Sequence, residues 1–160
     1  MRNIITTLIY LTRNFACRII VKEVDKESVY LREVQPLLEQ ALEPEMLNCI
    51  THIFEESDEK LFHKTRILND LLVASETSIL YNHDVDVVLP KNSVELAYTS
   101  IKDHGSDAVY PFGCGIYQWG VNYSDDLLDK FLSSFDGNTF DLDIVQKSLS
   151  LIHISEPTRL

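Results

Sequence analysis

The chain is poor in cysteine and lacks a long apolar run. Its 160 residues include three cysteines, Cys17, Cys49 and Cys114, which lie far apart and show neither zinc-binding spacing nor a disulfide framework. We therefore expect each cysteine to be a small buried apolar residue in a cytoplasmic, reducing environment. No apolar stretch approaches the ~20 residues that a membrane-spanning helix needs, and no small-residue cleavage site follows the apolar N-terminus. Neither a membrane span nor a signal peptide is expected.

Basic residues are also scarce. The chain has 14 Lys and Arg against 25 Asp and Glu, which gives a formal net charge of -11. A surface with this charge repels phosphate backbones, so a nucleic-acid partner is not expected. A small anionic ligand fits only where a metal ion or a local basic cluster offsets the repulsion. The hydrophobic content of 45% is enough to build the core of one ordinary domain.

The C-terminal residues do not resemble a natural coding sequence. Residues 149–159 read LSLIHISEPTR, which resembles the translation of a transposon-derived adapter used to prepare sequencing libraries. We therefore interpret residues 149–160 as an artefactual tail and exclude them from the fold argument. On this interpretation the natural sequence is cut near Ser148. The alternative is a natural amphipathic tail.

Hydrophobic spacing predicts strands that alternate with helices. Residues 3–13 carry apolar side chains at helical intervals but are rich in β-branched residues, so spacing alone leaves helix and strand open. The alternation predicts βαβ units, an α/β fold and a mostly parallel sheet. Ligands of such sheets bind at the carboxyl ends of the strands, where Glu23 and Asp84 are expected. The expected strands are residues 18–22, 49–54, 78–81 and 107–112, and the expected helices are residues 30–41, 61–75, 92–101 and 124–131.

An Asp-x-Asp sequence follows the third expected strand, which should be buried. Asp84 and Asp86 flank Val85, and the alternation of an extended backbone sends both carboxylates to one side. Two hard oxygen donors suit Mg²⁺ or Mn²⁺, and such a cation can hold a diphosphate and stabilise it as a leaving group. The pattern alone has low specificity, because Asp favours turns and because Asp141 and Asp143 form a second copy.

The surroundings of this motif resemble the donor domain of inverting glycosyltransferases of the large family two type, which have the GT-A fold. In that family a strand ending in acidic residues precedes a helix containing an Asn, and a strand ending in Asp-x-Asp follows. Here Glu23 follows the run IIVK, Asn69 lies in FHKTRILNDLLVAS, and Asp84 and Asp86 come fifteen and seventeen residues later. The runs FHKTRILND and ILYNHDVDVVLP look most like a bacterial subgroup. The resemblance covers residues 15–121.

The resemblance implies that residues 1–148 are an incomplete Rossmann-like GT-A domain that binds a nucleotide sugar. It implies that residues 3–14 are a helix, and that the strand which precedes this helix in the family is missing. The acceptor half, with the catalytic base, is expected to be missing as well. The intact parent would transfer a sugar from a nucleotide diphosphate, with uridine as the expected base, to a glycan or other acceptor. The fragment itself is expected to bind poorly and to transfer nothing.

The resemblance also implies roles for individual residues. Asp86 is expected to bind Mn²⁺ or Mg²⁺ directly, and Asp84 to contact the ribose or assist the metal. Glu23 is expected to accept hydrogen bonds from the uracil ring or its ribose. Arg66 and Asn69 are expected to line the nucleotide pocket.

Other interpretations of the same residues stay open. Lys64 is a further candidate for the pocket, but both Lys64 and Arg66 fit a solvated helix face equally well. His83 is expected to be a surface residue. A phosphotransferase of the haloacid dehalogenase type also uses an Asp-x-Asp at the end of a strand, and here Asp84 would be the nucleophile and Asp86 the general acid. In that family, however, the motif normally lies at the start of the fold. The third interpretation is a nucleotide-binding remnant without catalytic activity.

Overall fold

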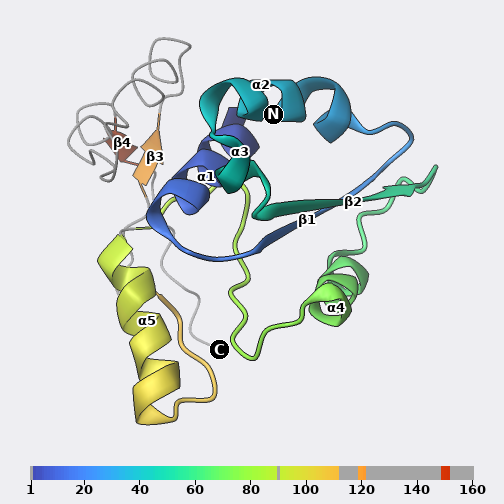
Figure 1. Ribbon diagram of the computed structural model, residues 1–160. Coiled ribbons are helices and arrows are strands. Elements are labelled where there is room, and N and C mark those ends of the chain that lie inside the picture. The colour runs from blue at the N-terminus through green and yellow to red at the C-terminus, as the bar shows by residue number, and fades with distance from the viewer. Residues whose placement is uncertain (1, 90, 112–118, 122–148, 152–160) are drawn as a thin grey trace. The chain divides into compact units, whose positions relative to one another are not determined.

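The architecture mixes helices with a two-stranded parallel sheet (Figure 1). The chain divides into two units, Met1–Val88 and Leu89–Leu160, which we describe separately. The expected α/β class is therefore confirmed at the level of a parallel sheet with helices. The computed structural model describes residues 2–89, 91–111, 119–121 and 149–151.

The parallel sheet belongs to the first unit. Strand β1 (Ile19–Asp25) pairs with β2 (Ile50–Glu56), with Lys22 opposite Ile53 at the centre of the register. The two strands predicted at these positions are confirmed, and the chain between them is helical, as a βαβ connection requires. Glu23 lies inside β1 and not at its end, because the strand continues two residues further.

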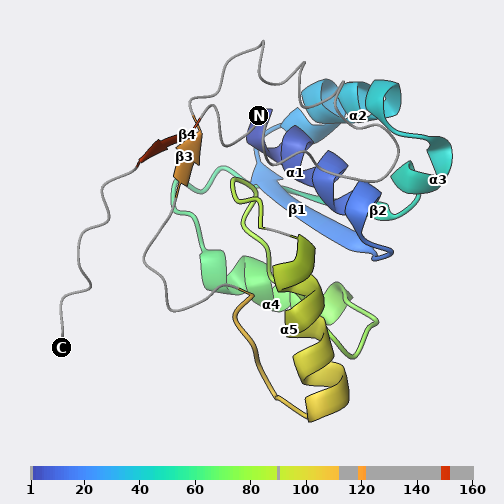
Figure 2. The same ribbon diagram turned by 90° about the vertical axis from the view of Figure 1, so that its left-hand side faces the viewer.

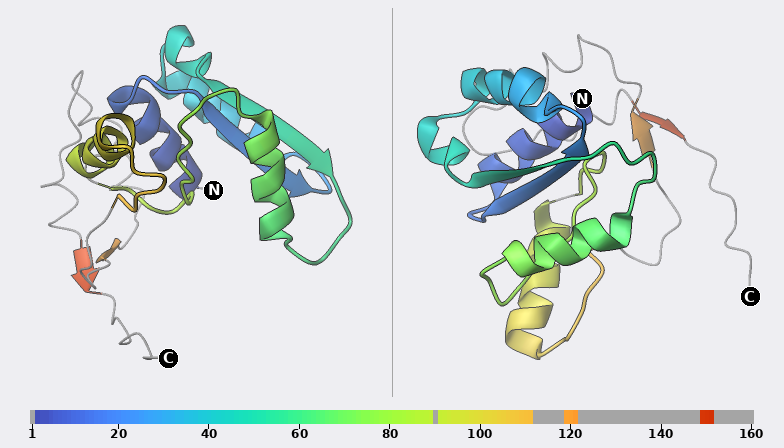
Figure 3. Two further views of the ribbon diagram at one scale, coloured as in Figure 1. Left: turned by 90° about the horizontal axis from the view of Figure 1, so that it is seen from below. Right: turned by 90° about the vertical axis from the view of Figure 1, so that its right-hand side faces the viewer.

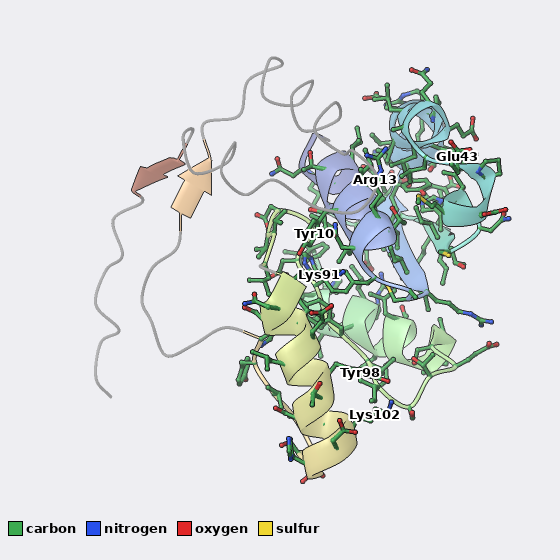
Figure 4. All side chains as sticks on the ribbon, turned by 60° about the vertical axis from the view of Figure 1, so that its left-hand side comes forward. Tyr10, Arg13, Glu43, Lys91, Tyr98 and Lys102 are labelled. Atoms are coloured by element: carbon green, nitrogen blue, oxygen red, sulfur yellow. The ribbon has the colours of Figure 1, made fainter. Side chains whose placement is uncertain are left out.

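Helix α1 (Arg2–Asn14) precedes the sheet. Residues 3–13, for which the spacing left helix and strand open, are therefore helical. Residues 5–11 are all buried, among them the β-branched Ile5 (3% exposed) and Ile9 (0% exposed), so burial all round the helix outweighs the lower helix propensity of these residues. Near its end, Nη2 of Arg13 donates a hydrogen bond of 2.7 Å to the carbonyl of Ala41 (Figure 4 labels Arg13), which ties α1 to the helical segment between the strands.

The helix predicted at residues 30–41 is confirmed as a π-helical turn, η1 (Tyr30–Val34), that continues into α2 (Gln35–Ala41). Pro36 stands in the first turn of α2, where its missing N–H costs nothing. The short α3 (Pro44–Leu47) follows, and α1, α2 and α3 lie on one face of the sheet (Figures 1 and 2). The apolar core of this unit consists of Ile5, Leu8, Ile9, Tyr10, Leu11, Tyr30, Val34, Leu38, Leu42 and Ile67.

Helix α4 (Lys64–Ala74) lies on the other face of the sheet (Figure 3). The predicted helix at residues 61–75 is therefore confirmed, although it begins three residues later. Its packing is loose: Ile67 is its one buried residue, whereas the side chains of Leu72 and Val73 are 57% and 85% exposed. Salt bridges, described below, carry much of its contact with the sheet.

Two of the expected strands are wrong. Residues 78–81 form no strand, and Leu80 and Tyr81 within them are 44% and 41% exposed. Residues 107–111 also form no strand. A short apolar run becomes a strand only where a neighbouring strand satisfies its backbone groups, and in the described part of the chain neither run has such a neighbour.

The second unit contains α5 (Lys91–His104), which confirms the helix expected at residues 92–101. The helix ends at His104 and is followed by Gly105, whose φ of 69° is a left-handed conformation that suits glycine. Along α5, Nζ of Lys102 lies 5.5 Å from the ring centroid of Tyr98, one turn away (Figure 4).

The same unit holds a short antiparallel pair, β3 (Trp119–Val121) with β4 (Leu149–Leu151). Residues 149–151, which we set aside as part of an artefactual tail, are thus paired in a strand. The helix expected at residues 124–131 lies outside the described residues. Among the described residues no helix combines the length and the apolar character needed to cross a membrane.

Candidate functional site

The Asp-x-Asp sequence lies in an exposed turn of the first unit. Val85 and Asp86 form the turn, and the backbone N–H of Val87 donates to the carbonyl of Asp84 at 3.3 Å. Both carboxylates are exposed to solvent. The expectation that this motif ends a buried strand is therefore wrong, because the residues before it form a loop.

The turn is held from two sides. The hydroxyl of Thr7, in the buried middle of α1, donates a hydrogen bond of 2.9 Å to the carbonyl of Val85, the residue between the two aspartates. Nζ of Lys64, at the start of α4, lies 3.4 Å from Oδ1 of Asp84. These partners lie 78 and 20 residues apart in the sequence, so the fold and not the local sequence determines where the Val85 carbonyl and the Asp84 carboxylate lie.

Two rings stand beside the turn. Nδ1 of His83 lies 2.7 Å from the carbonyl of Asp84, and its ring meets that of Tyr81 edge to face, with the centroids 5.1 Å apart. Burial lowers the pKa of His83, which favours the neutral imidazole, and the neighbouring Asp84 and Asp86 partly oppose this effect. Burial, with a smaller effect from Asp84, raises the pKa of Tyr81 to about 12. His83, which was expected to be a surface residue, is only partly exposed.

The residues expected on α4 lie near Lys64 but have different surroundings. Nη2 of Arg66 is 2.9 Å from Oε1 of Glu55 on β2 and 3.9 Å from Oε2 of Glu59. Asn69 is exposed on the same helix. The guanidinium is therefore engaged with acids of its own chain, while the amide of Asn69 is open to solvent.

Beneath α4, Lys22 joins the helix to the sheet. Its side chain is 7% exposed and forms ion pairs with Asp70 of α4 and, at 2.7 Å, with Glu55 of β2. The hydrogen bonds to Asp70 and Glu55 raise the pKa of Lys22. The hydrogen bond from Lys22, with the charge of Arg66 as a further cause, lowers the pKa of Glu55.

These shifts predict how stability depends on pH. The lowered pKa of Glu55 stabilises the fold above its ordinary value of 4.5, and this contribution is lost as the pH falls through the folded value. The raised pKa of Lys22 stabilises the fold below 10.5, and this contribution is lost as the pH rises through the folded value.

A substitution of Lys22 tests this pH dependence. We expect Lys22→Met to lower Tm most between pH 4.5 and pH 10.5 and least outside this range, as measured by circular dichroism. The control is Lys26→Met, because Lys26 forms a surface pair with Asp58 and is 72% exposed. Equal Tm profiles for the two variants would contradict the assignment.

Glu23 points to the opposite face of the sheet, because neighbouring residues of a strand alternate in direction. Its Oε1 accepts hydrogen bonds from the backbone N–H groups of Val29 (2.9 Å) and Tyr30 (3.1 Å). Its Oε2 accepts a bond of 2.7 Å from the hydroxyl of Ser28 and lies 3.0 Å from Nε2 of His52. The carboxylate thus holds the first turn of η1. The structure does not bring it together with the Asp-x-Asp turn.

A shallow hollow lies next to this carboxylate. It has a volume of about 220 Å³, and the stacked rings of Tyr30 and His52, with centroids 4.1 Å apart, form part of its wall. Its other lining residues are Gln35, Leu38, Glu39, Leu47 and Ile50. Sequence analysis did not single out His52 or Tyr30. The one available signal was a polar His inside an otherwise apolar strand pattern, next to the strand that carries Glu23.

The turn offers two carboxylates. This number suits a cation that also binds a diphosphate better than it suits a metal site made of protein ligands alone. Among the residues that the structure describes, no three His, Cys, Asp or Glu side chains form a group that could hold a metal ion. Mg²⁺ is commonly bound by one or two carboxylates and takes its other ligands from water and phosphate oxygens. Asp84 and Asp86 can supply these two carboxylates, and Lys64 can supply a positive charge beside a phosphate.

Comparisons with known proteins do not assign the chain to a family. No protein-family model, curated protein or solved structure matches the chain.

Proposed function

We propose that this chain is the nucleotide-sugar-binding part of a metal-dependent glycosyltransferase and that the turn Asp84–Asp86 binds the diphosphate through Mn²⁺ or Mg²⁺. The observation that carries the proposal is the double attachment of this turn. Thr7 holds its backbone, and Lys64 connects it to α4, the helix that also bears Arg66. A turn attached in this way keeps the carboxylate of Asp84 near the cationic start of α4, and Asp86 follows two residues later in the same turn.

The charges around the turn support this assignment. A protein with a net charge of -11 repels a diphosphate in general, so binding requires local positive charge. Lys64 and a divalent cation on Asp84 and Asp86 would provide that charge in one place. A cation held by Asp84 and Asp86 would offset the charge of the diphosphate and so make it a better leaving group. In this proposal Asn69 offers an amide to the nucleotide, whereas Glu23 supports the fold and does not contact the ligand.

The proposal predicts metal-dependent binding of a nucleotide. The test is isothermal titration calorimetry of the 160-residue chain with uridine diphosphate, with and without Mn²⁺. We expect binding only with Mn²⁺. Asp86→Ala should weaken this binding by on the order of tenfold or more.

The matched control is Asp58→Ala, which removes an exposed carboxylate whose side chain is 85% accessible. Asp58→Ala should leave the measured heats of uridine diphosphate binding unchanged. If Asp86→Ala and the unmodified protein give equal heats with Mn²⁺, the metal assignment is wrong. A haloacid-dehalogenase-type enzyme would instead be protected from proteolysis by fluoroberyllate, which mimics a phosphoryl group on a carboxylate, and we expect no such protection here.

A further inference from the structure

The hollow beside Glu23 has a lining without basic side chains. Its apolar lining residues come from α2, α3 and β2, and these three elements contain no Lys or Arg along their length. In η1, which supplies the ring of Tyr30, the one basic residue is Arg32, and its guanidinium is paired with Glu27 and Glu33. A ligand in this hollow therefore meets hydrogen-bond acceptors and negative charge, and no free cation of these elements.

His52 provides one acceptor in the wall of the hollow. Its side chain is 10% exposed, and its Nε2 lies 3.0 Å from Oε2 of Glu23. In the neutral imidazole, Nε2–H donates to this carboxylate, so Nδ1 carries the lone pair. In the part of the chain that the structure describes, the imidazole forms no other hydrogen bond. The stacked ring of Tyr30 supports this orientation, and Nδ1 is left to accept a bond from a ligand.

Glu39 provides a carboxylate on the lining of the same hollow. Its Oε1 accepts a hydrogen bond of 2.7 Å from Nε2 of Gln35, which leaves the amide oxygen of Gln35 as a further acceptor. Among the described residues, Glu39 forms no ion pair. The hollow thus contains a negative charge that no side chain of the described chain neutralises.

The apolar part of the lining is held in place by Cys49. Its backbone N–H donates to the carbonyl of Met46 at 3.1 Å, and its Sγ lies 3.6 Å from the carbonyl of Glu45, so it fastens α3, which supplies Leu47, to the start of β2. Cys49 is half-buried and Cys17 is exposed. The expectation that these two cysteines are buried apolar residues is therefore wrong.

We propose that this hollow binds an ammonium group on a short alkyl chain. The ammonium donates to Nδ1 of His52 and to the carboxylate of Glu39, and the chain lies against Leu38, Leu47 and Ile50. An ammonium has three N–H donors and no acceptor, so it complements a lining of acceptors, whereas Glu39 repels an anion. The volume of about 220 Å³ is below the roughly 300–1,000 Å³ of pockets for drug-sized ligands, which limits the chain to a few carbons. The site shares no residue with the Asp84–Asp86 turn and does not depend on the proposed function.

The test is an NMR titration of the ¹⁵N-labelled chain with n-butylamine at about pH 8, where an alkyl amine is protonated because its pKa is close to the ~10.4 of lysine. We expect amide shifts concentrated in residues 35–39 and 47–52, with a Kd on the order of millimolar. n-Butanol has the same chain without the charge and should bind on the order of tenfold more weakly. Butyrate should not bind. Equal affinity for n-butanol and n-butylamine would overturn the proposal, because it would leave apolar contact as the only attraction.

Two matched variants separate the hollow from the general negative charge of the protein. Glu39→Gln keeps the shape of the side chain but removes its charge, so it should weaken n-butylamine binding about fivefold. Glu45→Gln makes the same change in net charge at an exposed residue that does not line the hollow, and its Kd should be unchanged. Equal weakening by the two variants would contradict the assignment to the hollow.

The same chemical group occurs in free amines and in lysine side chains. A lysine blocked at both its amino and its carboxyl group is therefore titrated in parallel. If it produces the same shifts as n-butylamine, the hollow accepts a lysine side chain of a partner. If only n-butylamine binds, the ligand is a free amine. If neither compound shifts residues 35–39 and 47–52, the proposal is wrong.

Discussion

Replacing Glu23 with alanine is expected to lower the free energy of unfolding by about 3 kcal/mol, since hydrogen bonds to a charged group contribute about 1.5–3 kcal/mol each and are not additive. The side chain is 17% exposed and accepts bonds from Ser28, Val29 and Tyr30. Without it, the N–H groups at the start of η1 lose an acceptor that water reaches poorly. The carboxylate also lies at the positive end of the helix that continues into α2, which adds to its effect.

Two further substitutions make this test specific. Glu23→Gln keeps one oxygen for the N–H groups of Val29 and Tyr30, so it should cost less, about 1–1.5 kcal/mol. Glu27→Ala is the matched control, because Glu27 is 81% exposed and its ion pair with Arg32 at 3.1 Å is a surface pair worth about 0–1 kcal/mol. The measurement is urea unfolding, in which the midpoint should move at constant m-value. A Glu23→Ala midpoint that matches that of Glu27→Ala would show that the carboxylate does not hold the turn.

The same experiment bears on the proposed function. If Glu23 acts through the fold, nucleotide binding by Glu23→Gln should be unchanged under conditions in which the variant is fully folded. A loss of binding by folded Glu23→Gln would place this carboxylate in contact with the nucleotide, as the resemblance to glycosyltransferases first implied.

Leu38→Ala should also destabilise the first unit by about 3 kcal/mol, within the range of about 2–5 kcal/mol for large-to-small substitutions in a core. Leu38 is fully buried in α2, in the core that α1 and η1 share. Alanine is an excellent helix former, so the loss would come from the missing side-chain contacts and the cavity, not from helix propensity.

The neighbouring residue provides the control. Leu37 belongs to the same helix and is 41% exposed. The same substitution at Leu37 has the same effect on helix propensity but removes few buried contacts, so we expect a change of less than about 1 kcal/mol. Both values can be measured by thermal and urea unfolding. Similar losses for the two variants would mean that α2 does not present Leu38 to the core.

Helices α4 and α5 and the first two strands could be predicted from sequence because each has a strong local pattern, whereas spacing left α1 open between helix and strand and the short α3 was not predicted. Residues 64–74 and 91–104 have apolar side chains at helical spacing, and residues 19–25 and 50–56 are short β-branched runs that pair with each other. The failure at residues 78–81 has a different cause. Such a run has no fixed structure of its own, and whether it becomes a strand depends on a partner that local pattern does not reveal.

The candidate site was predicted in part. Asp84 and Asp86 are recognisable by residue type and spacing, and the structure connects Asp84 to α4 through Lys64. The role of Glu23 could not be predicted, because its partners are the backbone of η1 and a histidine from the next strand. The anchoring hydroxyl of Thr7 was equally hidden, since 78 residues separate it from the carbonyl that it binds.

Lys22 and Glu23 are neighbours that serve opposite sides of one strand, and this fixes how β1 can align with its surroundings. A shift of β1 by one residue in its register would turn the side chains of each face of the strand to the opposite face of the sheet. A shift in one direction would move Glu23 between Glu55 and Asp70, which repel it. A shift in the other direction would move Lys22 against the N–H groups of Val29 and Tyr30, which cannot accept a hydrogen bond from it. Opposite charges at adjacent positions of β1 therefore fix the register of this strand, which apolar residues alone could not do in a sheet of two strands.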